Sequence, residues 1–225
     1  KHVLTAHEQG AAHAADGYAR STGKTGVVFA TSGPGATNLV TGIATAFMDS
    51  VPMVAITSNV PDNLIGRDAF QEICITGVTM PVTKHNFFVN RIEDLPGAMR
   101  DAFRIANSGR KGPVLVDVTK DVSGAILDYK PGQAPEKTPD LPKTNGENLH
   151  KIAEVINSAK RPVIYFGGGV PLANAERELA ELMDKSDIPA TYTLMAAGTI
   201  SYDNPKNMGL IGMHGTIAAN TSMEK

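Results

Sequence analysis

The fold is decided by Val27-Val28-Phe29-Ala30-Thr31-Ser32-Gly33-Pro34-Gly35-Ala36-Thr37-Asn38, an apolar run followed by a glycine-rich turn. The run from 27 to 30 is apolar throughout, which is typical of a strand buried on both faces. From Thr37 to Asp49 the residues Leu39, Ile43 and Phe47 recur every four positions, so this segment is predicted to be a helix with one apolar face. The stretch therefore predicts a strand, a tight turn and a helix.

The same alternation of short apolar runs and helical patterns continues on both sides of this stretch. Further strands are predicted at Val3–Ala6, Met53–Ile56 and Val114–Val118, and helices at Gln9–Ser21 and Leu95–Asn107. Strands that are apolar throughout and separated by helices indicate an α/β fold, a parallel sheet with flanking helices on both faces.

The character of the sequence changes from Ser123 to Gly146. This segment is polar, has no periodicity and contains Pro131, Pro135, Pro139 and Pro142, which predicts a linker. We therefore expect a first domain at 1–122 and the start of a second α/β domain at 147–225.

The second domain begins with a predicted helix and ends inside another. Strands are predicted at Val163–Phe166 and Ala190–Thr193, and the chain stops in what reads as a starting helix. The apolar faces expected to point inward are those of Leu149, Ile152, Ala153 and Ile156, then of Leu172, Ala175, Leu179 and Leu182.

The composition excludes several classes of protein. With a net charge of −2 and 5% aromatic residues, the 225-residue chain shows no basic face for nucleic acid. Its apolar runs are too short to span a membrane, and its six histidines show no metal-site spacing, so no metal ligand is predicted. The one cysteine, Cys74, favours a reducing compartment and is interpreted as a packed small hydrophobe.

Two turns in the first domain could carry chemistry. Glu8 opens a predicted helix at the end of a predicted strand, where open α/β sheets bind ligands. An acid in a first helical turn is also a common structural feature, because it complements the helix dipole. The turn with Gly33 and Gly35 could let the backbone approach an anion, or it could be only a tight connection.

Two glycine-flanked loops in the second domain have the same ambiguity. Gly167-Gly168-Gly169 follows a predicted strand and suits close approach to a pyrophosphate, although a plain turn explains it equally well. Gly212-Met213-His214-Gly215-Thr216 precedes a predicted helix, and a lone histidine such as His214 is more often structural than a ligand.

The residues of these motifs and their order along the chain resemble the acetohydroxyacid synthase (acetolactate synthase) family of thiamin-diphosphate enzymes over nearly the whole chain. The matching motifs are His7-Glu8-Gln9-Gly10-Ala11-Ala12, Gly17-Tyr18-Ala19-Arg20, 31–40, Asp49-Ser50-Val51-Pro52, 65–72, Thr83-Lys84-His85-Asn86, 108–118 and 212–216. One departure is Ala196-Ala197, where the family more often has Gly-Leu.

The resemblance implies three domains per subunit. Residues 1–122 would form the pyrimidine-binding domain without its opening elements, 123–146 the linker, and 147–225 the first part of a central FAD-binding domain. The diphosphate-binding domain would be absent, and with it the Mg²⁺ ligands, because no Gly-Asp-Gly followed by a distal Asn occurs here.

The resemblance also implies site residues. Glu8 would be catalytic, touching the aminopyrimidine ring of thiamin diphosphate, and an apolar pocket would raise its pKa. Residues near that cofactor would be Gly33, Pro34, Gly35 and Asn38. Residues lining FAD would be Arg110, Gly167, Gly168, Gly169, Thr193, Leu194, Met195, Gly212, Met213 and His214, with Gly215 and Thr216 in the same loop. The substrate channel would include Pro61, Phe70, Gln71 and Lys120.

The implied activity is acetolactate synthase. Pyruvate is decarboxylated and its two-carbon unit passes to a second α-keto acid, which gives acetolactate or acetohydroxybutyrate for branched-chain amino acids. The alternatives are a pyruvate oxidase or glyoxylate carboligase type of enzyme, or a non-catalytic flavin- or nucleotide-binding module. We expect a homodimer or larger assembly, possibly with a regulatory small subunit, in the cytoplasm or, in a eukaryote, a plastid or mitochondrion. The 225 residues alone should be inactive.

Overall fold

The computed structural model describes residues 2–129 and 145–224. The chain divides into two compact units, Lys1–Asp140 and Leu141–Lys225. Each unit has its own parallel sheet, and each is described here by itself.

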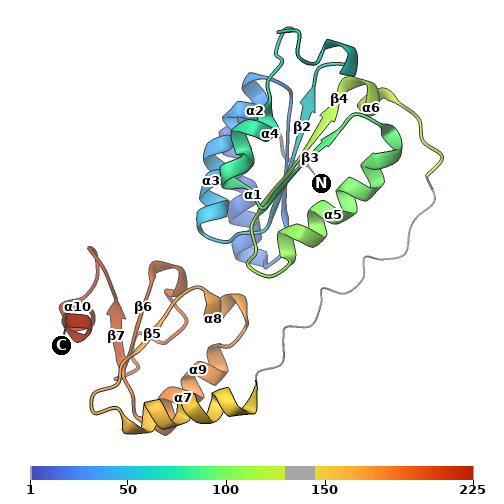
Figure 1. Ribbon diagram of the computed structural model, residues 1–225. Helices are drawn as coiled ribbons and strands as arrows, with labels where there is room; N and C mark the ends of the chain where they lie inside the picture. Colours follow the sequence, from blue (N-terminus) through green and yellow to red (C-terminus); the bar gives the residue numbers. More distant parts are fainter. Residues whose placement is uncertain (1, 130–144, 225) are drawn as a thin grey trace. The chain divides into compact units, whose positions relative to one another are not determined.

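A four-stranded sheet forms the centre of the first unit. Its strands are β1 (Gly26–Ala30), β2 (Met53–Asn59), β3 (His85–Val89) and β4 (Pro113–Thr119), in the order β1-β2-β4-β3. All neighbours pair in parallel, so every strand ends at the same edge of the sheet (Figure 1). This carboxyl edge is where an open α/β sheet binds its ligands.

Helices cover the two faces of this sheet, which confirms the predicted α/β class. Helices α1 (Glu8–Thr22) and α3 (Val40–Met48) lie on one face, and α5 (Leu95–Asn107) lies on the other (Figure 1). Each face has its own buried cluster, one around Leu39 and Ile43, the other around Val114 and Val116. The helix α5 has the predicted bounds, with Pro96 in its first turn.

The short elements lie mainly in the loops between these. They are α2 (Pro34–Asn38), η1 (Asp62–Leu64), α4 (Ile75–Thr79), η2 (Met80–Val82), η3 (Ile92–Asp94) and α6 (Lys120–Gly124). The helix expected over 37–49 is therefore two helices, with Leu39 between α2 and α3. Helix α6 occupies the start of the predicted linker, and residues 130–144 of that linker lie outside the described residues.

Glycine and alanine set the spacing between α1 and α3. A Cβ at Gly42 would lie 2.4 Å from the Cβ of Ala12, so a side chain there would clash. Arg20, in the last turn of α1, joins this helix to the end of α3. Its Nε lies 2.7 Å from Asp16 Oδ2 in α1, and its Nη2 lies 2.7 Å from Asp49 Oδ2, directly after α3. The two helices are thus held at a distance that larger residues could not adopt.

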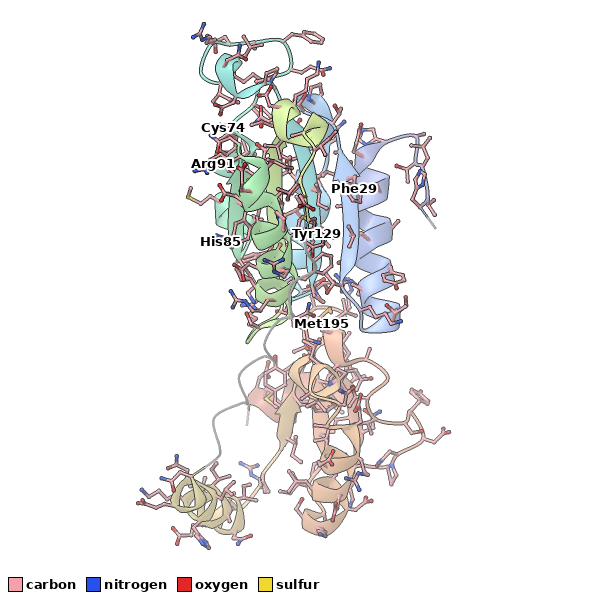
Figure 2. All side chains as sticks on the ribbon, turned by 90° about the vertical axis from the view of Figure 1, so that its right-hand side faces the viewer. Phe29, Cys74, His85, Arg91, Tyr129 and Met195 are labelled. Atoms are coloured by element: carbon pink, nitrogen blue, oxygen red, sulfur yellow. The ribbon has the colours of Figure 1, made fainter. Side chains whose placement is uncertain are left out.

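Two expectations for the first strands are wrong. Residues 3–6 form no strand, and the side chains of Val3 and Leu4 are exposed. The strand β1 lies at an edge of the sheet, where Val28 is buried but Val27 and Phe29 are exposed, Phe29 to 69%. Figure 2 marks Phe29 on this strand. Its apolar run therefore does not mean burial on both faces.

The second unit has a three-stranded parallel sheet, β5 (Ile164–Phe166), β6 (Ala190–Tyr192) and β7 (Asn207–Leu210), paired in that order. Its helical elements are α7 (Gly146–Ser158), α8 (Gly169–Leu172), α9 (Glu176–Ser186), η4 (Leu194–Ala196) and α10 (Ile217–Glu224). The strand β7 was not predicted from the sequence, since it is short and contains Gly209 at φ +90°.

The inward faces predicted for this unit are partly wrong. Leu179 is buried, but Leu172 and Leu182 are exposed, and Met183 is the second buried residue of α9. The prediction assumed one helix, whereas α8 and α9 are separate and the buried pair follows the i, i+4 spacing of α9 alone. No residue of α7 is buried. Within 2–129 and 145–224, we find no helix with the length and hydrophobicity to cross a membrane.

Replacing Gly42 tests the spacing between α1 and α3. Gly42→Ala should destabilise the protein by about 1–3 kcal/mol, because the added methyl group overpacks the contact with Ala12. The control is Gly97→Ala, in α5, where no atom lies within 4 Å of the new Cβ; helix propensity alone should then stabilise by about 0.5–1 kcal/mol. Denaturant unfolding measures both, and equal stabilities would contradict the packing argument.

Candidate functional site

Glu8 lies in the first turn of α1, at the carboxyl edge of the first sheet. The helix begins there because His7 caps it, with its Nδ1 accepting a hydrogen bond from the backbone N–H of Gln9 at 3.1 Å. The Glu8 carboxylate accepts a hydrogen bond from Asn38 Nδ2 at 3.0 Å. Two residues 30 positions apart, both predicted as site residues, are therefore in direct contact.

The glycine turn shapes the space beside this carboxylate. A Cβ at Gly35 would lie 2.7 Å from Thr31 Cγ2 and 3.4 Å from Glu8 Oε1, so only glycine leaves this position open. Gly33 has φ +60°, a conformation that favours glycine, and Pro34 follows as the first residue of α2. The turn thus brings backbone, rather than side chains, up to Glu8.

The pKa of Glu8 shifts in the opposite direction to the one expected. The hydrogen bond from Asn38 is the main reason that the pKa of Glu8 lies below its ordinary value, and a backbone hydrogen bond acts in the same sense. Burial raises the pKa less, because the carboxyl group is still partly exposed. In this chain Glu8 is an ionised acceptor and does not sit in an apolar pocket.

The loops that follow β2, β4 and β3 meet at the same edge. The backbone N–H of Asp62 donates to Asp121 Oδ2, and Asn90 Nδ2 donates to Asp62 Oδ1 at 2.9 Å. Their neighbours Pro61 and Lys120, both predicted to line a substrate channel, are therefore brought to one end of the sheet. Lys120 is exposed.

The other two predicted channel residues lie in the loop between η1 and α4, which arches over the carboxyl edge (Figures 1 and 2). Phe70 is 88% exposed. A Cβ at Gly33 would lie 2.8 Å from the Cβ of Gln71, so this loop packs directly on the glycine turn. Gln71 is thereby connected to the turn that also borders Glu8.

A buried polar cluster below this loop was missed in the sequence. Asp117 is almost fully buried in β4, and its carboxylate accepts hydrogen bonds from Thr57 Oγ1 at 2.7 Å and Asn59 Nδ2 at 2.6 Å. Burial raises the pKa of Asp117, and these two hydrogen bonds lower it to a smaller extent. A cavity of about 310 Å³ borders the cluster, and Cys74 lies on its wall.

Cys74 is exposed in the structure, so its interpretation as a packed small hydrophobe is wrong (Figure 2). It precedes α4 at a turn, and the apolar run that contains it places Ile75 rather than the thiol in the core. No sequence pattern indicated the buried cluster, because Thr57 and Asn59 lie at the polar end of β2 and Asp117 is a single acid inside the apolar strand β4.

The flavin-type residues of the second unit gather at the carboxyl edge of its sheet. The glycine loop follows β5 and the segment with Thr193, Leu194 and Met195 follows β6. Cβ atoms at Gly167 and Gly168 would lie 3.1 Å from Thr193 Oγ1 and 3.0 Å from Met195 Cβ. The two loops therefore approach each other as closely as glycine allows, while Leu194 remains exposed.

The third loop of this edge follows β7. The side chain of Asn220 in α10 holds this loop by two hydrogen bonds to Gly212. Its Oδ1 accepts from Gly212 N–H at 2.9 Å, and its Nδ2 donates to Gly212 O at 3.0 Å. Thr216 caps α10 by accepting from Ala219 N–H at 3.0 Å. Gly215 is required because its Cβ would lie 2.3 Å from Leu210 O. The residues between, Met213 and His214, are exposed.

Arg110 lies at the opposite edge of the first sheet from Glu8. Its Nε donates to Ser50 Oγ at 2.7 Å and its Nη2 to Met48 O at 3.2 Å, just before β4 and β2 begin. Its predicted contact with a flavin is therefore separate from the Glu8 region. Among the described residues, no three His, Cys, Asp or Glu side chains are grouped closely enough to bind a metal ion.

Two families match the chain. Residues 1–80 match the N-terminal TPP binding domain of thiamine pyrophosphate enzymes, and residues 149–225 match the central domain of the same enzymes. The first match contains Glu8, the glycine turn and the loop with Phe70 and Gln71. The second contains the two glycine-flanked loops of the second sheet and the loop with Thr193 between them in sequence.

Individual relatives match over nearly the whole chain. An acetolactate synthase of Arthrospira platensis is 49% identical over 98% of this chain, which covers 39% of that protein. A probable acetolactate synthase large subunit of Methanocaldococcus jannaschii is 52% identical, over 97% of the chain and 38% of the relative. The acetolactate synthase isozyme 1 large subunit of Escherichia coli is 47% identical, over 100% of the chain and 40% of the relative. The chain thus spans well under half the length of these relatives.

Removing the Asn38 amide tests the cause of the Glu8 pKa shift. Asn38→Ala should raise the pKa of Glu8 towards its ordinary range, because the bond that favours the ionised form is lost. A carboxyl titration by NMR measures the pKa, with Thr37→Ala as the control in the same short helix. A lowered pKa in the folded state contributes stability that is lost as the pH falls. The free energy of unfolding of the variant should therefore decrease less on acidification than that of the wild type. An unchanged Glu8 titration would contradict the assignment.

Proposed function

Because two domain families of thiamine pyrophosphate enzymes together match most of the chain, we propose that it forms part of an acetolactate synthase large subunit. The observation that carries this proposal is the contact of Glu8 with Asn38 beside the open position at Gly35. The relatives at 47–52% identity favour this reading over other thiamin-diphosphate enzymes or a non-catalytic module.

The residues at the carboxyl edge suit the pyrimidine end of thiamin diphosphate. When bound, this cofactor supplies the nucleophilic carbon that attacks the carbonyl group of pyruvate. Glu8 would share a proton with a ring nitrogen: once that nitrogen is protonated, the carboxylate accepts a hydrogen bond from it, and this needs a free carboxylate oxygen. Asn38 occupies one carboxylate oxygen, Oε2, and the absence of a side chain at Gly35 leaves room beside the other, Oε1.

We propose that the two units are the pyrimidine-binding domain and the first part of the central domain. The diphosphate end of the cofactor and its Mg²⁺ would then need residues outside these 225, since the described part of the chain offers no metal cluster. Anion binding by the start of α2 could not replace them, because an exposed helix end contributes only about 0.3–1 kcal/mol.

We also propose that the second unit contributes to an FAD site. Its two glycine-flanked loops and the loop with Thr193 follow neighbouring parallel strands and lie at one edge, where the glycines permit close approach to a dinucleotide. The exposed side chains of Leu194 and Met213 offer apolar surface at the same edge. The flavin would have no redox role in the main reaction.

The proposed substrates are pyruvate and a second α-keto acid. Pro61, Phe70, Gln71 and Lys120 would line their channel, because they lie in loops at the same sheet edge as Glu8. Two of the relatives are large subunits by name, which supports a partnership with a regulatory small subunit. We further propose a homodimer or larger assembly in a reducing compartment such as the cytoplasm.

Substituting Glu8 tests the proposed activity. In the full-length enzyme Glu8→Gln should lower turnover of pyruvate by roughly 10²–10⁴, the scale expected for a lost acid–base group, without changing folding or FAD content. The matched control is Glu93→Gln, a surface acid 3.7 Å from Arg91, which should retain activity. Acetolactate formation by the colorimetric end-point assay is the readout, and near-normal turnover of Glu8→Gln would remove Glu8 from the mechanism.

The flavin proposal has its own test. The purified full-length protein should be yellow, and Arg110→Ala should lose FAD more readily on gel filtration, because a guanidinium near the bound cofactor is removed. Arg104→Ala is the control, since Arg104 is an exposed arginine paired with Asp101 on α5. The absorbance near the flavin maximum measures the content. A colourless protein that is fully active without added FAD would defeat the proposal.

A further inference from the structure

The loop from 65 to 72 has an unusual backbone. Gly66, Asp68 and Gln71 all have positive φ, at +77°, +52° and +61°. Left-handed backbone is unfavourable for residues with a side chain, so Asp68 and Gln71 keep it only if their surroundings impose it. The loop carries Phe70 and Gln71, which we propose as channel residues.

The carboxylate of Glu72 closes this loop. One oxygen, Oε1, accepts from the backbone N–H of Gly66, and the other, Oε2, accepts from the backbone N–H of Ala69 at 2.9 Å. The Glu72 backbone N–H also donates to Ala69 O at 2.9 Å. The hydrogen bonds from Ala69 and Gly66 lower the pKa of Glu72, so the carboxylate is ionised at neutral pH and both bonds are charge-assisted.

A cavity, rather than packed side chains, separates part of the loop from the sheet. The cavity of about 310 Å³ lies under it, between Ile65, Glu72 and Ile73 on one side and Asn59, Phe88 and Asp117 of the sheet on the other. Phe70, at the loop's tip, is exposed and so is not held by a core contact. The hydrogen bonds of the Glu72 side chain are therefore a principal constraint on the part of the loop from 66 to 69, while Gln71 packs on Gly33.

The shape of the loop matters to the site because Gln71 packs on Gly33. A Cβ at Gly33 would lie 2.8 Å from Gln71 Cβ and 2.9 Å from Gln71 Cα and O. Gly33 caps α2, and α2 carries the Asn38 that bonds Glu8. A displaced Gln71 would thus move away from the turn beside Glu8.

We propose that Glu72 is a positioning residue that sets the enzyme's choice of acceptor, by fixing the loop that presents Phe70 and Gln71. This inference rests on the proposed function. The two acceptors, pyruvate and 2-ketobutyrate, differ by one methylene group, and a well-formed apolar contact can separate such substrates about 10–200-fold. Selectivity of that kind depends on a side chain held in one place, which Glu72 provides without touching substrate.

The test uses the full-length holoenzyme with Glu72→Ala and Glu72→Gln. Glutamine can accept one of the two backbone bonds through its amide oxygen but not both, so it should give an intermediate effect. With pyruvate and 2-ketobutyrate in competition, the ratio of acetohydroxybutyrate to acetolactate should shift about threefold to tenfold in Glu72→Ala. Pyruvate decarboxylation should change less than this ratio.

A second readout does not depend on activity. Hydrogen exchange at the amides of Gly66 and Ala69 should accelerate in Glu72→Ala and less in Glu72→Gln. Glu93→Ala, which removes an exposed acid on another loop, should alter neither exchange nor the product ratio. Unchanged exchange in Glu72→Ala overturns the loop-holding role.

Three activity results also overturn the inference. These are an unchanged product ratio, an equal fall in decarboxylation and product formation, or losses that follow the melting temperature alone. A wild-type enzyme that forms no acetohydroxy acid would instead refute the proposed function and the acceptor role with it. The exchange measurement would then still decide whether Glu72 holds the loop.

Discussion

The site depends on how closely α1 approaches the α2–α3 segment. Ala12 and Gly42 meet where no larger pair would fit, and Gly35 leaves open the place where a methyl group would press on Thr31. Because the two segments are this close, Asn38 can reach Glu8 from a position 30 residues away. A carboxylate at the start of α1 thereby gains a fixed orientation, and the hydrogen bond from Asn38 becomes the main cause of its lowered pKa.

The parallel sheet extends this local constraint to the rest of the edge. All four strands end on one side, so the loops after β2, β3 and β4 meet there and are joined through Asp62. The loop over the edge rests on the glycine turn through Gln71 and is closed by Glu72. Inside the sheet, Thr57 and Asn59 satisfy the buried carboxylate of Asp117, which would otherwise be costly to bury. The second unit follows the same plan, with a glycine-flanked loop after β5 and another after β7.

Much of this could be predicted from local patterns. The apolar runs predicted the central strands, Pro96 marked the start of α5, and the order and residues of the motifs indicated the family. The failures concern partners that lie far away in the sequence. Whether residues 3–6 form a strand, or whether Phe29 is covered, depends on which strand or helix lies beside them, and no local period contains that information. The Glu72 clamp and the lowered Glu8 pKa depend on individual hydrogen bonds, which become visible only when the loops are folded.

The central claim is that the carboxyl edge beside Glu8, with Asn38 and Gly35, is where a thiamin-diphosphate cofactor places its pyrimidine ring. The most direct measurement is a crystal structure of the full-length protein grown with thiamin diphosphate and Mg²⁺. The account predicts a ring nitrogen within hydrogen-bond distance of Glu8 Oε1, the Asn38–Glu8 bond retained, and the ring passing over the open position at Gly35. A cofactor whose ring lies away from Glu8, or a Glu8 carboxylate that faces solvent in the bound state, would contradict it.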